Sequence, residues 1–313
     1  MKYHRLIRKV VELQRRKGLI PKGASLLLAF SGGVDSVALT LCMLELKDFL
    51  RLKRLALAHI NHQLRGDESY RDEAFCVEFA KAKGLEVFVE RIEVKLEGEN
   101  LEAKARELRY KALEEVRQRE GFDLIATAHH LNDLAETVLL WLVRGAGREG
   151  LLGFEEKKGN IVRPLYLATR EEIEDFVRSK RENWVEDSTN YDLSYARNLI
   201  RHKVIPELKK INPRLEESFL RLKEILKEEE EVLEELTQKA IMEVFKEGEL
   251  DRRAFLKLPQ AIKRRIVYRF YCIRSMKEID SIINSIKKGY ALEKPGHVIN
   301  IKSLSAEVKE CNG

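Results

Sequence analysis

A short segment near the N-terminus has the residue types of a phosphate-binding loop. Its members are Ser31, Gly32, Gly33, Val34, Asp35 and Ser36, and they stand between the apolar run 26–30 and an apolar helical pattern near 36–50. Two adjacent glycines let the backbone approach an anion closely, the serine hydroxyls add donors, and the free N–H groups of a helix start favour negative charge. The pattern predicts a site for phosphate or pyrophosphate. A tight turn with an Asp or Ser helix cap is the alternative.

The aspartate inside this segment indicates a divalent cation. Asp35 would repel a phosphate group unless a cation lay between them, so the sequence predicts Mg²⁺ bridging this carboxylate to the phosphates. The chain has no Gly-Lys dipeptide and therefore lacks the GxxxxGK[ST] loop of the common nucleotide triphosphatases. A second glycine pattern, GxGxxG over 145–150, follows a helical run, whereas a dinucleotide fingerprint must follow a strand. We expect a different class of nucleotide site.

Further polar groups follow two other predicted strands. His59 lies in the run 55–60, and the run 123–128 leads into a segment that carries His129, His130, Asp133 and Glu136. Because Asp133 and Glu136 are at helical spacing, they share one face of the helix that follows. Two carboxylates beside a nucleotide suit a metal ion or an amino group of a second substrate. A capping role for Asp133 and a packing role for His130 are the alternatives, and a zinc site lacks an evident third set of ligands.

Two groups of basic residues could bind an anion. Arg106 and Arg109 share a face of the helix predicted over 101–119, where they could clamp a phosphate or a carboxylate or pair with nearby glutamates. Downstream, Arg197 and Arg201 are aligned on a basic helical stretch that also contains Lys203. We expect this second pair to face one phosphate-bearing ligand.

The elements that must position these residues alternate between short apolar runs and longer helical patterns. Strands are predicted at 26–30, 55–60, 86–92, 123–128 and, more weakly, 161–165, and helices near 36–50, 69–84, 101–119, 131–143 and 169–181. Strands joined by crossovers of this length pair in parallel. The fold class is therefore α/β, with a parallel five-stranded sheet and helices on both faces. A helical period over 216–247 opens a smaller, mostly helical domain, and the boundary is expected near Asn212 and Pro213.

Composition limits the class of protein. The chain has 313 residues, of which 44% are hydrophobic and 35% are charged, and this excludes a disordered chain and fits two domains. No apolar run approaches the roughly 20 residues of a membrane span, and the charged N-terminus is unlike a signal peptide, so we expect a cytoplasmic protein. The four cysteines form no CxxC, which argues against a disulfide framework or a zinc knuckle.

The C-terminal region is strongly basic, although the net charge of the chain is only +6. Residues 251–313 carry 14 basic and 6 acidic side chains, against 5 basic and 10 acidic in 221–250. Within this region four basic residues alternate with three aromatic ones: Lys263, Arg264, Arg265, Tyr268, Arg269, Phe270 and Tyr271. The basic residues could bind RNA phosphates and the rings could stack on exposed bases. A packed helix with basic outer residues is the alternative.

Six motifs occur in a fixed order along the chain. They are SGGVDS, HINHQLR, NLEAKARELRY, HHLNDLAET, WVEDSTN and RNLIRHKVIPEL. The first resembles the pyrophosphate loop of the N-type ATP pyrophosphatases, or PP-loop proteins. The whole set, over about 25–210, resembles the tRNA(Ile)-lysidine synthase family. The last two motifs separate this family from the related tRNA sulfurtransferases, which share only the earlier ones.

This resemblance implies a domain order and a reaction. It implies an N-type ATP pyrophosphatase catalytic domain over 1–212 and a helical, tRNA-binding C-terminal domain over 213–313, without the second C-terminal domain of longer members. The family uses ATP, Mg²⁺ and L-lysine to convert the wobble cytidine of a CAU-anticodon tRNA(Ile) into lysidine. The reaction passes through an adenylated tRNA and releases AMP and pyrophosphate. A homodimer is compatible with this reading.

The resemblance also implies a role for each motif residue. ATP binding falls to the residues from Ser31 to Ser36 and to His59, with Mg²⁺ on Asp35. Lysine binding falls to Asp133, Glu136 and Arg109. The residues implied in catalysis are Asp35, Asp133, His129, Arg109 and Arg201. Residues predicted to bind tRNA are Arg197, Arg201 and Lys203 in the last motif and, from the basic character of the C-terminal region and not from a motif, Lys263, Arg264, Arg265 and Arg269.

Three other functions are open from the sequence alone. A tRNA sulfurtransferase would need reactive cysteines or an iron–sulfur cluster, but Cys42 and Cys76 lie in apolar helical contexts typical of structural residues. An ATP-dependent amide ligase acting on a small metabolite would leave the basic C-terminal region unexplained. A non-catalytic, ATP-dependent RNA-binding protein would not need the acidic motif positions, all of which are occupied.

Overall fold

The structure is a computed structural model that describes residues 3–63, 66–92, 101–186, 192–246, 249–271 and 275–288. The chain divides into two compact units, residues 1–223 and 224–313. Each unit has a hydrophobic core of its own. None of the helices in the described part of the chain has both the length and the apolar character needed to cross a membrane.

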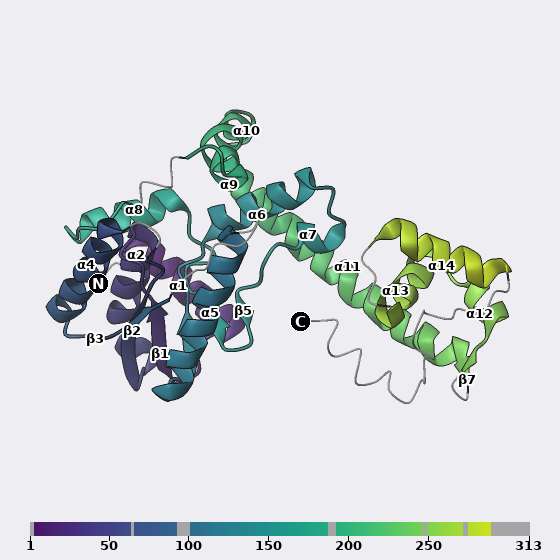
Figure 1. Ribbon diagram of the computed structural model, residues 1–313, viewed down its shortest axis with the longest axis horizontal. Helices are drawn as coiled ribbons and strands as arrows, with labels where there is room; N and C mark the ends of the chain where they lie inside the picture. The colour runs from purple at the N-terminus through teal and green to yellow at the C-terminus, as the bar shows by residue number, and fades with distance from the viewer. Residues whose placement is uncertain are drawn as a thin grey trace. The chain divides into compact units, whose positions relative to one another are not determined.

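One six-stranded sheet forms the centre of the first unit, with the strand order β3-β2-β1-β4-β6-β5. Figure 1 labels β1, β2, β3 and β5 of this sheet. The strands are β1 (Ser25–Ala29), β2 (Arg54–Asn61), β3 (Glu86–Arg91), β4 (Leu124–Ala126), β5 (Lys157–Lys158) and β6 (Ile161–Val162). All neighbours pair in parallel except β5, which joins β6 antiparallel at the edge. The predicted parallel five-stranded α/β sheet is confirmed, and the short strand β5 extends it.

Helices cover both faces of the sheet, because successive side chains of a strand point to opposite sides. On one face, Leu26 and Leu28 of β1 share a core with α1 (Arg5–Lys17), α2 (Val34–Glu45), α4 (Asp67–Ala82) and α8 (Arg170–Ser179). On the other face, Leu27 packs with Leu113 and Val116 of α5 (Leu101–Arg119). The predicted placement of helices on both faces is confirmed.

The order of the strands determines where the polar motifs meet. β1 and β4 are adjacent and parallel, so the loop that follows β1 and the start of α6 (Leu131–Val143) lie at the same edge of the sheet. The remaining helical elements of this unit are α3 (Lys47–Leu50), α7 (Arg148–Leu151), α9 (Ala196–Leu199), the π-helical turn η2 (Ile200–Val204) and α10 (Ile205–Ile211). Contacts between α6 and both α9 and η2 bring the basic motif to this same edge.

Helix α1 has no counterpart among the helices predicted from the sequence. Leu6, Ile7, Val10 and Leu13 are buried at helical spacing, and this face packs into the core shared with α8. Lys9 also donates to Glu172 of α8 at 2.7 Å. The segment contains many charged residues, so its composition does not indicate a buried helix. The spacing of its apolar residues is nevertheless that of an amphipathic helix.

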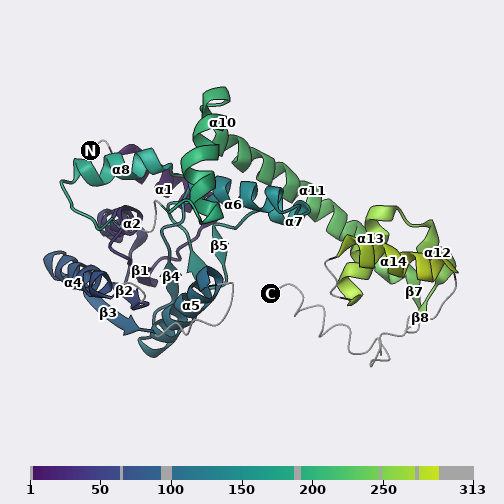
Figure 2. The same cartoon turned by 45° about the horizontal axis from the view of Figure 1, so that its top comes forward.

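The second unit is mostly helical, as predicted (Figure 2). It contains the later part of α11 (Leu215–Val244), the hairpin β7 (Phe245–Lys246) and β8 (Glu249–Leu250), and the helices α12 (Arg252–Lys257), α13 (Gln260–Tyr271) and α14 (Met276–Lys288). Its core combines Val244 with Phe255 of α12, Ile262 and Ile266 of α13, and Ile283 of α14.

The division between the units lies inside α11, after residue 223, about ten residues beyond the boundary expected near Asn212 and Pro213. Asn212 is extended and does end α10. The first turns of α11 nevertheless belong to the first unit, because Phe219 packs against its core and Lys223 donates to the Tyr166 hydroxyl at 2.7 Å. Tertiary packing thus extends the first unit beyond the break in the helix.

The N-terminal cap of α8 can be tested by substitution of Thr169. The Thr169 hydroxyl accepts a hydrogen bond from the Glu172 N–H at 3.4 Å, and Glu172 accepts one from the Thr169 N–H at 2.9 Å. Thr169→Ala should lower the free energy of unfolding by about 1 kcal/mol, because one N–H at the helix start loses its partner. Thr169→Ser keeps the oxygen and should stay close to the wild type in urea denaturation followed by circular dichroism. Equal losses of unfolding free energy in Thr169→Ala and Thr169→Ser would contradict a capping role for Thr169.

Candidate active site

The loop 31–36 has a backbone that only glycine accommodates at Gly32. Its φ is +82°, and a Cβ placed there would lie 3.1 Å from Phe75 and 3.3 Å from the Cys76 sulfur. The Val185 N–H donates to the Gly32 carbonyl at 2.9 Å, and the Ser36 hydroxyl donates to the Gly33 carbonyl at 2.9 Å. The loop is therefore held on both sides by hydrogen bonds within the protein.

The N-terminus of α2 faces out of this loop. Gly33 is the residue before the first turn, and no side chain caps the helix there. The N–H groups of the first turn, starting with Val34, are thus available to an anion, as the sequence predicts for a phosphate site. Asp35 and Ser36 also lie in this turn.

His59 lies beneath the loop and has little contact with solvent. Its Nδ1 is 3.0 Å from the Phe30 carbonyl and 3.2 Å from the Cys76 sulfur, and its buried Nε2 has no hydrogen-bond partner in the described structure. Burial lowers the pKa of His59, so the ring is neutral near pH 7. A neutral ring that gives Nδ1–H to a carbonyl leaves Nε2 as an acceptor.

Asp35 is paired with an arginine that the sequence analysis did not select. Arg170, the first residue of α8, has its Nη1 at 2.9 Å and 3.2 Å from the two Asp35 oxygens. The His130 Nε2 lies 3.6 Å from Asp35 on another side. Nothing in the local sequence of Arg170 marks it, because α8 comes next to α2 only through the packing of the two helices.

The carboxylates of α6 are paired with the two arginines of the basic motif. Arg197 Nε donates to Glu136 at 2.8 Å and its Nη2 donates to Asp133 at 3.0 Å. Arg201 donates to the two Glu136 oxygens at 2.6 and 2.9 Å. The Glu136 side chain is only 2% exposed, so its charge depends on these two partners. The structure therefore places Arg197 and Arg201 on the predicted lysine-binding carboxylates.

His130 joins the two acidic groups. Its Nε2 is 3.5 Å from Asp133 as well as 3.6 Å from Asp35. Burial lowers the pKa of His130, but the charges of Asp133, Asp35 and Glu136 outweigh burial and raise it to about 9. Burial raises the pKa of Asp133, yet His130 and Arg197 hold it well below its usual range. The Asp133 carboxylate also accepts a hydrogen bond from the His130 N–H at 3.0 Å. Asp133 therefore also caps the start of α6, which is the alternative role considered for it.

His129 and Arg109 lie in the same electrostatic environment. The His129 Nδ1 is 2.9 Å from the Thr127 hydroxyl, and its ring meets Phe154 edge-on at 5.4 Å. Burial lowers the pKa of His129 to about 3, against the opposite influence of Asp133. Burial also lowers the pKa of Arg109, on which Arg197 and Asp133 act in opposite directions. His129 is therefore a neutral residue beside a cluster of cations.

Asp35 fits a magnesium ion as one carboxylate ligand. The side chain is 32% exposed at the mouth of the phosphate loop, and a carboxylate oxygen is the donor that Mg²⁺ prefers. In the part of the chain that the structure describes, no group of three or more His, Cys, Asp or Glu side chains could hold a metal ion. Phosphate oxygens and water would have to supply the remaining ligands.

The residues predicted to bind tRNA are divided between two settings. Lys203 is exposed on η2. In the second unit, Arg264 pairs with Asp280 at 2.8 Å, Arg265 pairs with Glu230 at 2.5 Å, and Arg269 pairs with Glu234. Lys263 lies near the Leu256 carbonyl at 3.4 Å. The three arginines thus connect α13 with α14 and α11.

The aromatic residues of α13 take part in packing. Phe270 contacts Phe245 with ring centroids 4.5 Å apart, and Tyr268 and Tyr271 pack against the core of the second unit. Helix α13 therefore matches the alternative, a packed helix with basic outer residues.

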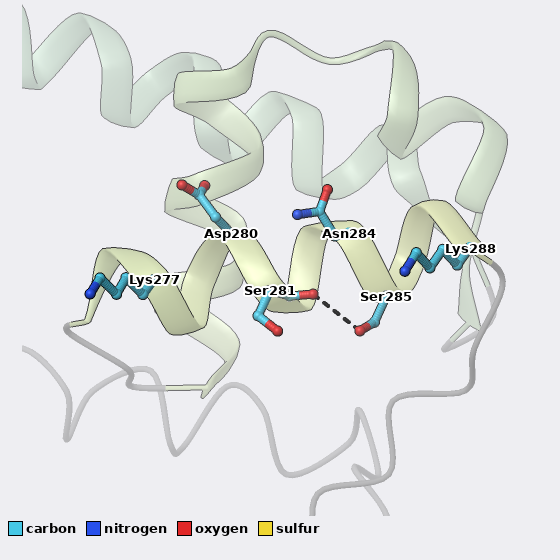
Figure 3. Close-up of a pocket in the computed structure, with 6 residues that line it drawn as sticks. All are labelled: Lys277, Asp280, Ser281, Asn284, Ser285 and Lys288. Carbon is cyan, nitrogen blue, oxygen red and sulfur yellow. Dashed lines mark hydrogen bonds between the residues drawn. The ribbon is translucent and has the colours of Figure 1, made fainter.

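A pocket lies along the outer side of α14, lined by Lys277, Asp280, Ser281, Asn284, Ser285 and Lys288 (Figure 3). It has polar and basic side chains but no histidine or cysteine.

Cys42 and Cys76 are buried, and burial raises the pKa of each thiol above its usual range. Cys272 and Cys311 lie outside the described residues. The GxGxxG pattern begins after α6 and runs into α7, so it follows a helix and not a strand, as expected. Neither feature adds a second site to the one formed by the loop 31–36 and α6.

Comparison with known proteins places these motifs in one family. The PP-loop domain family matches residues 2–208. A tRNA(Ile)-lysidine synthase of Persephonella marina is 39% identical over 264 residues, which cover 83% of this chain and 58% of that protein. The same enzyme of Thermosipho africanus is 34% identical over 294 residues, 90% of this chain and 67% of that protein. The chain thus spans about three-fifths to two-thirds of the length of these curated relatives.

A solved structure is similar in fold. A U34-tRNA thiolase from Methanococcus maripaludis, determined with its [4Fe-4S] cluster, superposes with a TM-score of 0.59 at 20% sequence identity. The alignment covers 71% of this chain and 78% of that one. At this identity the likeness concerns the fold alone.

The raised pKa of His130 has a consequence for stability. The pKa in the folded protein, about 9, lies above the value of about 6.5 expected for an unfolded chain, so protonated His130 stabilises the folded state fully below the unfolded value. This contribution is lost as the pH rises through about 9. Urea denaturation of wild type and His130→Gln, with EDTA and without nucleotide, should show a stability difference that shrinks between pH 6 and 10. A difference that does not change with pH would contradict the charge network.

Proposed function

The chain belongs to the PP-loop family and, within it, to the tRNA(Ile)-lysidine synthases, and from this premise we propose that it ligates L-lysine to C2 of the wobble cytidine of a CAU-anticodon tRNA(Ile). The PP-loop family uses ATP. The observation that carries the proposal is the direct connection of two sites. Asp35 of the phosphate loop reaches Asp133 of α6 through a single side chain, that of His130.

The chemistry explains why a nucleotide site must adjoin an amine site. The C2 oxygen of cytosine is a poor leaving group, so it first attacks the α-phosphate of ATP and pyrophosphate departs. The lysine ε-amine then adds at C2 and the oxygen leaves as part of AMP. Both steps occur at one carbon and its oxygen, and the activated base must therefore lie within reach of both sites.

The loop residues would hold the triphosphate. The N–H groups at the start of α2 and the hydroxyls of Ser31 and Ser36 would donate to phosphate oxygens. The Nε2 of His59 is an acceptor, so it would take a hydrogen bond from a hydroxyl or amino group of the nucleotide and not from a phosphate oxygen. Asp35 would hold Mg²⁺, which neutralises charge as pyrophosphate leaves. Arg170 now occupies the Asp35 carboxylate and would have to move from it toward the phosphates.

The same exchange applies to the other arginines. Arg197 and Arg201 are bound to Asp133 and Glu136, which leaves neither carboxylate open to a lysine ammonium group. A triphosphate carries more charge than a carboxylate and binds guanidinium groups well. We propose that bound ATP draws these arginines onto its phosphates and thereby releases Asp133 and Glu136 for L-lysine, so that ATP binds before lysine.

Arg109 and His129 would contact the activated base. Asp133 acts electrostatically on both of them, which supports a role for them beside the proposed amine site. A neutral His129 can form a hydrogen bond with the base without adding another positive charge to the cluster.

The second unit would contribute to tRNA binding through its basic side chains. Lys263, together with Lys277 and Lys288 at the ends of the α14 pocket, provides cations for RNA phosphates (Figure 3). Arg264, Arg265 and Arg269 would support this surface by holding its helices together. A tRNA substrate would place the reaction in the cytoplasm.

A sulfur-transfer reaction has less support in this chain. The two described cysteines are buried, and burial raises the pKa of each thiol, whereas a sulfur carrier needs an accessible thiolate. An amide ligase acting on a small metabolite would leave the lysines of the second unit without a role.

The direct test is incorporation of labelled L-lysine into unfractionated tRNA with Mg·ATP, followed by mild alkali to remove any aminoacyl ester. We expect base-stable label confined to a CAU-anticodon tRNA(Ile). Asp133→Asn should lose lysine transfer by at least about a hundredfold while keeping ATP-dependent pyrophosphate release, because it removes the amine-binding charge and leaves the loop intact.

Glu174→Gln is the matched control, since it removes one charge from α8 near Arg170 but outside the α6 carboxylates. It should retain lysine transfer. Alkali-labile label would indicate aminoacylation, and pyrophosphate release without any label would indicate the thiolase or the small-molecule ligase reaction. Normal lysine transfer by Asp133→Asn would contradict the assignment of the amine site.

A further inference from the structure

Three arginines gather around one tyrosine on the side of the sheet covered by α5. The guanidinium carbons of Arg106 and Arg109 lie 5.3 and 5.6 Å from the centre of the Tyr110 ring. Arg163, which directly follows β6, lies 5.3 Å from the centre of the Phe154 ring. Phe154 in turn contacts His129 edge-on, so the cluster adjoins the candidate active site.

The cluster contains a buried donor that has no partner. Arg163 is only 5% exposed, and although its Nη1 donates to the Glu155 carbonyl at 2.6 Å, its Nε is buried without a hydrogen-bond partner. The Tyr110 hydroxyl is also buried, and it lies beside the Arg163 guanidinium group. Unsatisfied buried donors are costly, and the free Nε of Arg163 indicates an absent acceptor.

The charge of the cluster is also uncompensated. Among the described residues, none of the three arginines forms an ion pair with a carboxylate within 4.0 Å, whereas Arg197 and Arg201 in the adjoining site each pair with both Asp133 and Glu136. The positive charge also acts on His129. Burial is the main cause that lowers the pKa of His129, and Arg106, Arg163 and Arg109 lower it further, whereas Asp133 raises it. An anion would satisfy both the free donor and the charge.

We propose that Arg106, Arg163 and Tyr110 form a binding site for a phosphate group of the RNA substrate. Two guanidinium groups and a hydroxyl supply several convergent donors, which suits the tetrahedral oxygens of phosphate better than a planar carboxylate. The phosphates of ATP have their own donors on the loop after β1, whereas this cluster comes from α5 and the end of β6. The proposal rests on the proposed function, because it assigns the anion to a tRNA backbone beside the reacting base.

The test compares two arginines of the same helix. Arg106 is exposed, so Arg106→Gln should fold, and Arg119→Gln is the matched control because Arg119 is also on α5 but pairs with Glu90 and Glu120. We expect Arg106→Gln to weaken tRNA binding about tenfold and to flatten its salt dependence by roughly one phosphate contact, a slope change of about 0.7–0.9. Arg119→Gln should leave the salt slope unchanged. Affinity for α,β-methylene ATP should be the same in both variants.

Tyr110→Phe gives a second, milder probe. It keeps the ring under Arg106 and Arg109 and removes only the hydroxyl, so it should weaken tRNA binding without lowering thermal stability. Weaker ATP binding with unchanged tRNA binding would assign the site to the nucleotide and overturn the proposal. Unchanged binding of both ligands in Arg106→Gln and Tyr110→Phe would mean that the cluster is structural.

Failure of the phosphate-site proposal can be distinguished from failure of the proposed function. If wild-type protein binds tRNA with the expected salt dependence but transfers no lysine, the function fails and the phosphate site is still tested by Arg106→Gln. If wild-type protein binds no tRNA, the RNA assignment is overturned together with the function. Protection of the wild type, but not Arg106→Gln, against heat by inorganic phosphate would then leave an anion site of another kind.

Discussion

The buried carboxylates of α6 impose the constraint on which the rest of the site depends. Glu136 is almost fully enclosed and Asp133 nearly so, and carboxylates in such places must be paired. Their partners come from α9 and η2, far along the chain, so the requirement to neutralise α6 fixes where the basic motif lies. His130 and Asp35 continue the network to the phosphate loop, and Arg170 closes it from α8. One set of charges therefore positions four separate elements around the carboxyl end of the sheet.

This network also gives the proposed reaction an order. In the structure, Asp35, Asp133 and Glu136 are matched by Arg170, Arg197 and Arg201, with protonated His130 in addition. A triphosphate competes for the arginines, and a lysine ammonium group competes for the carboxylates. The first ligand makes room for the second, because each arginine that moves to a phosphate leaves a carboxylate in need of a cation. The arrangement would keep lysine out until ATP is present to activate the base.

The sequence predicts the sheet well because each strand is a short apolar run between polar turns, and the motifs at the strand ends identify the site edge. It misses what packing alone creates. Arg170 and Arg163 stand in segments without a motif, and they reach the site only because α8 packs on α2 and β6 pairs with β4. Arg197 and Arg201 are read as phosphate ligands because charge and spacing do not show which anion they face. Helix α1 is not predicted from the sequence because polar and charged residues outnumber the apolar residues in this segment.

In the proposed reaction, bound nucleotide frees the α6 carboxylates for lysine. Calorimetric titration of L-lysine into the protein, with and without Mg²⁺ and α,β-methylene ATP, measures this directly. We expect lysine to bind at least about tenfold tighter when the analogue is bound, since the arginines then hold its phosphates. Equal lysine affinity in the two titrations would contradict it, because the carboxylates would then be open to lysine while Arg197 and Arg201 still hold them.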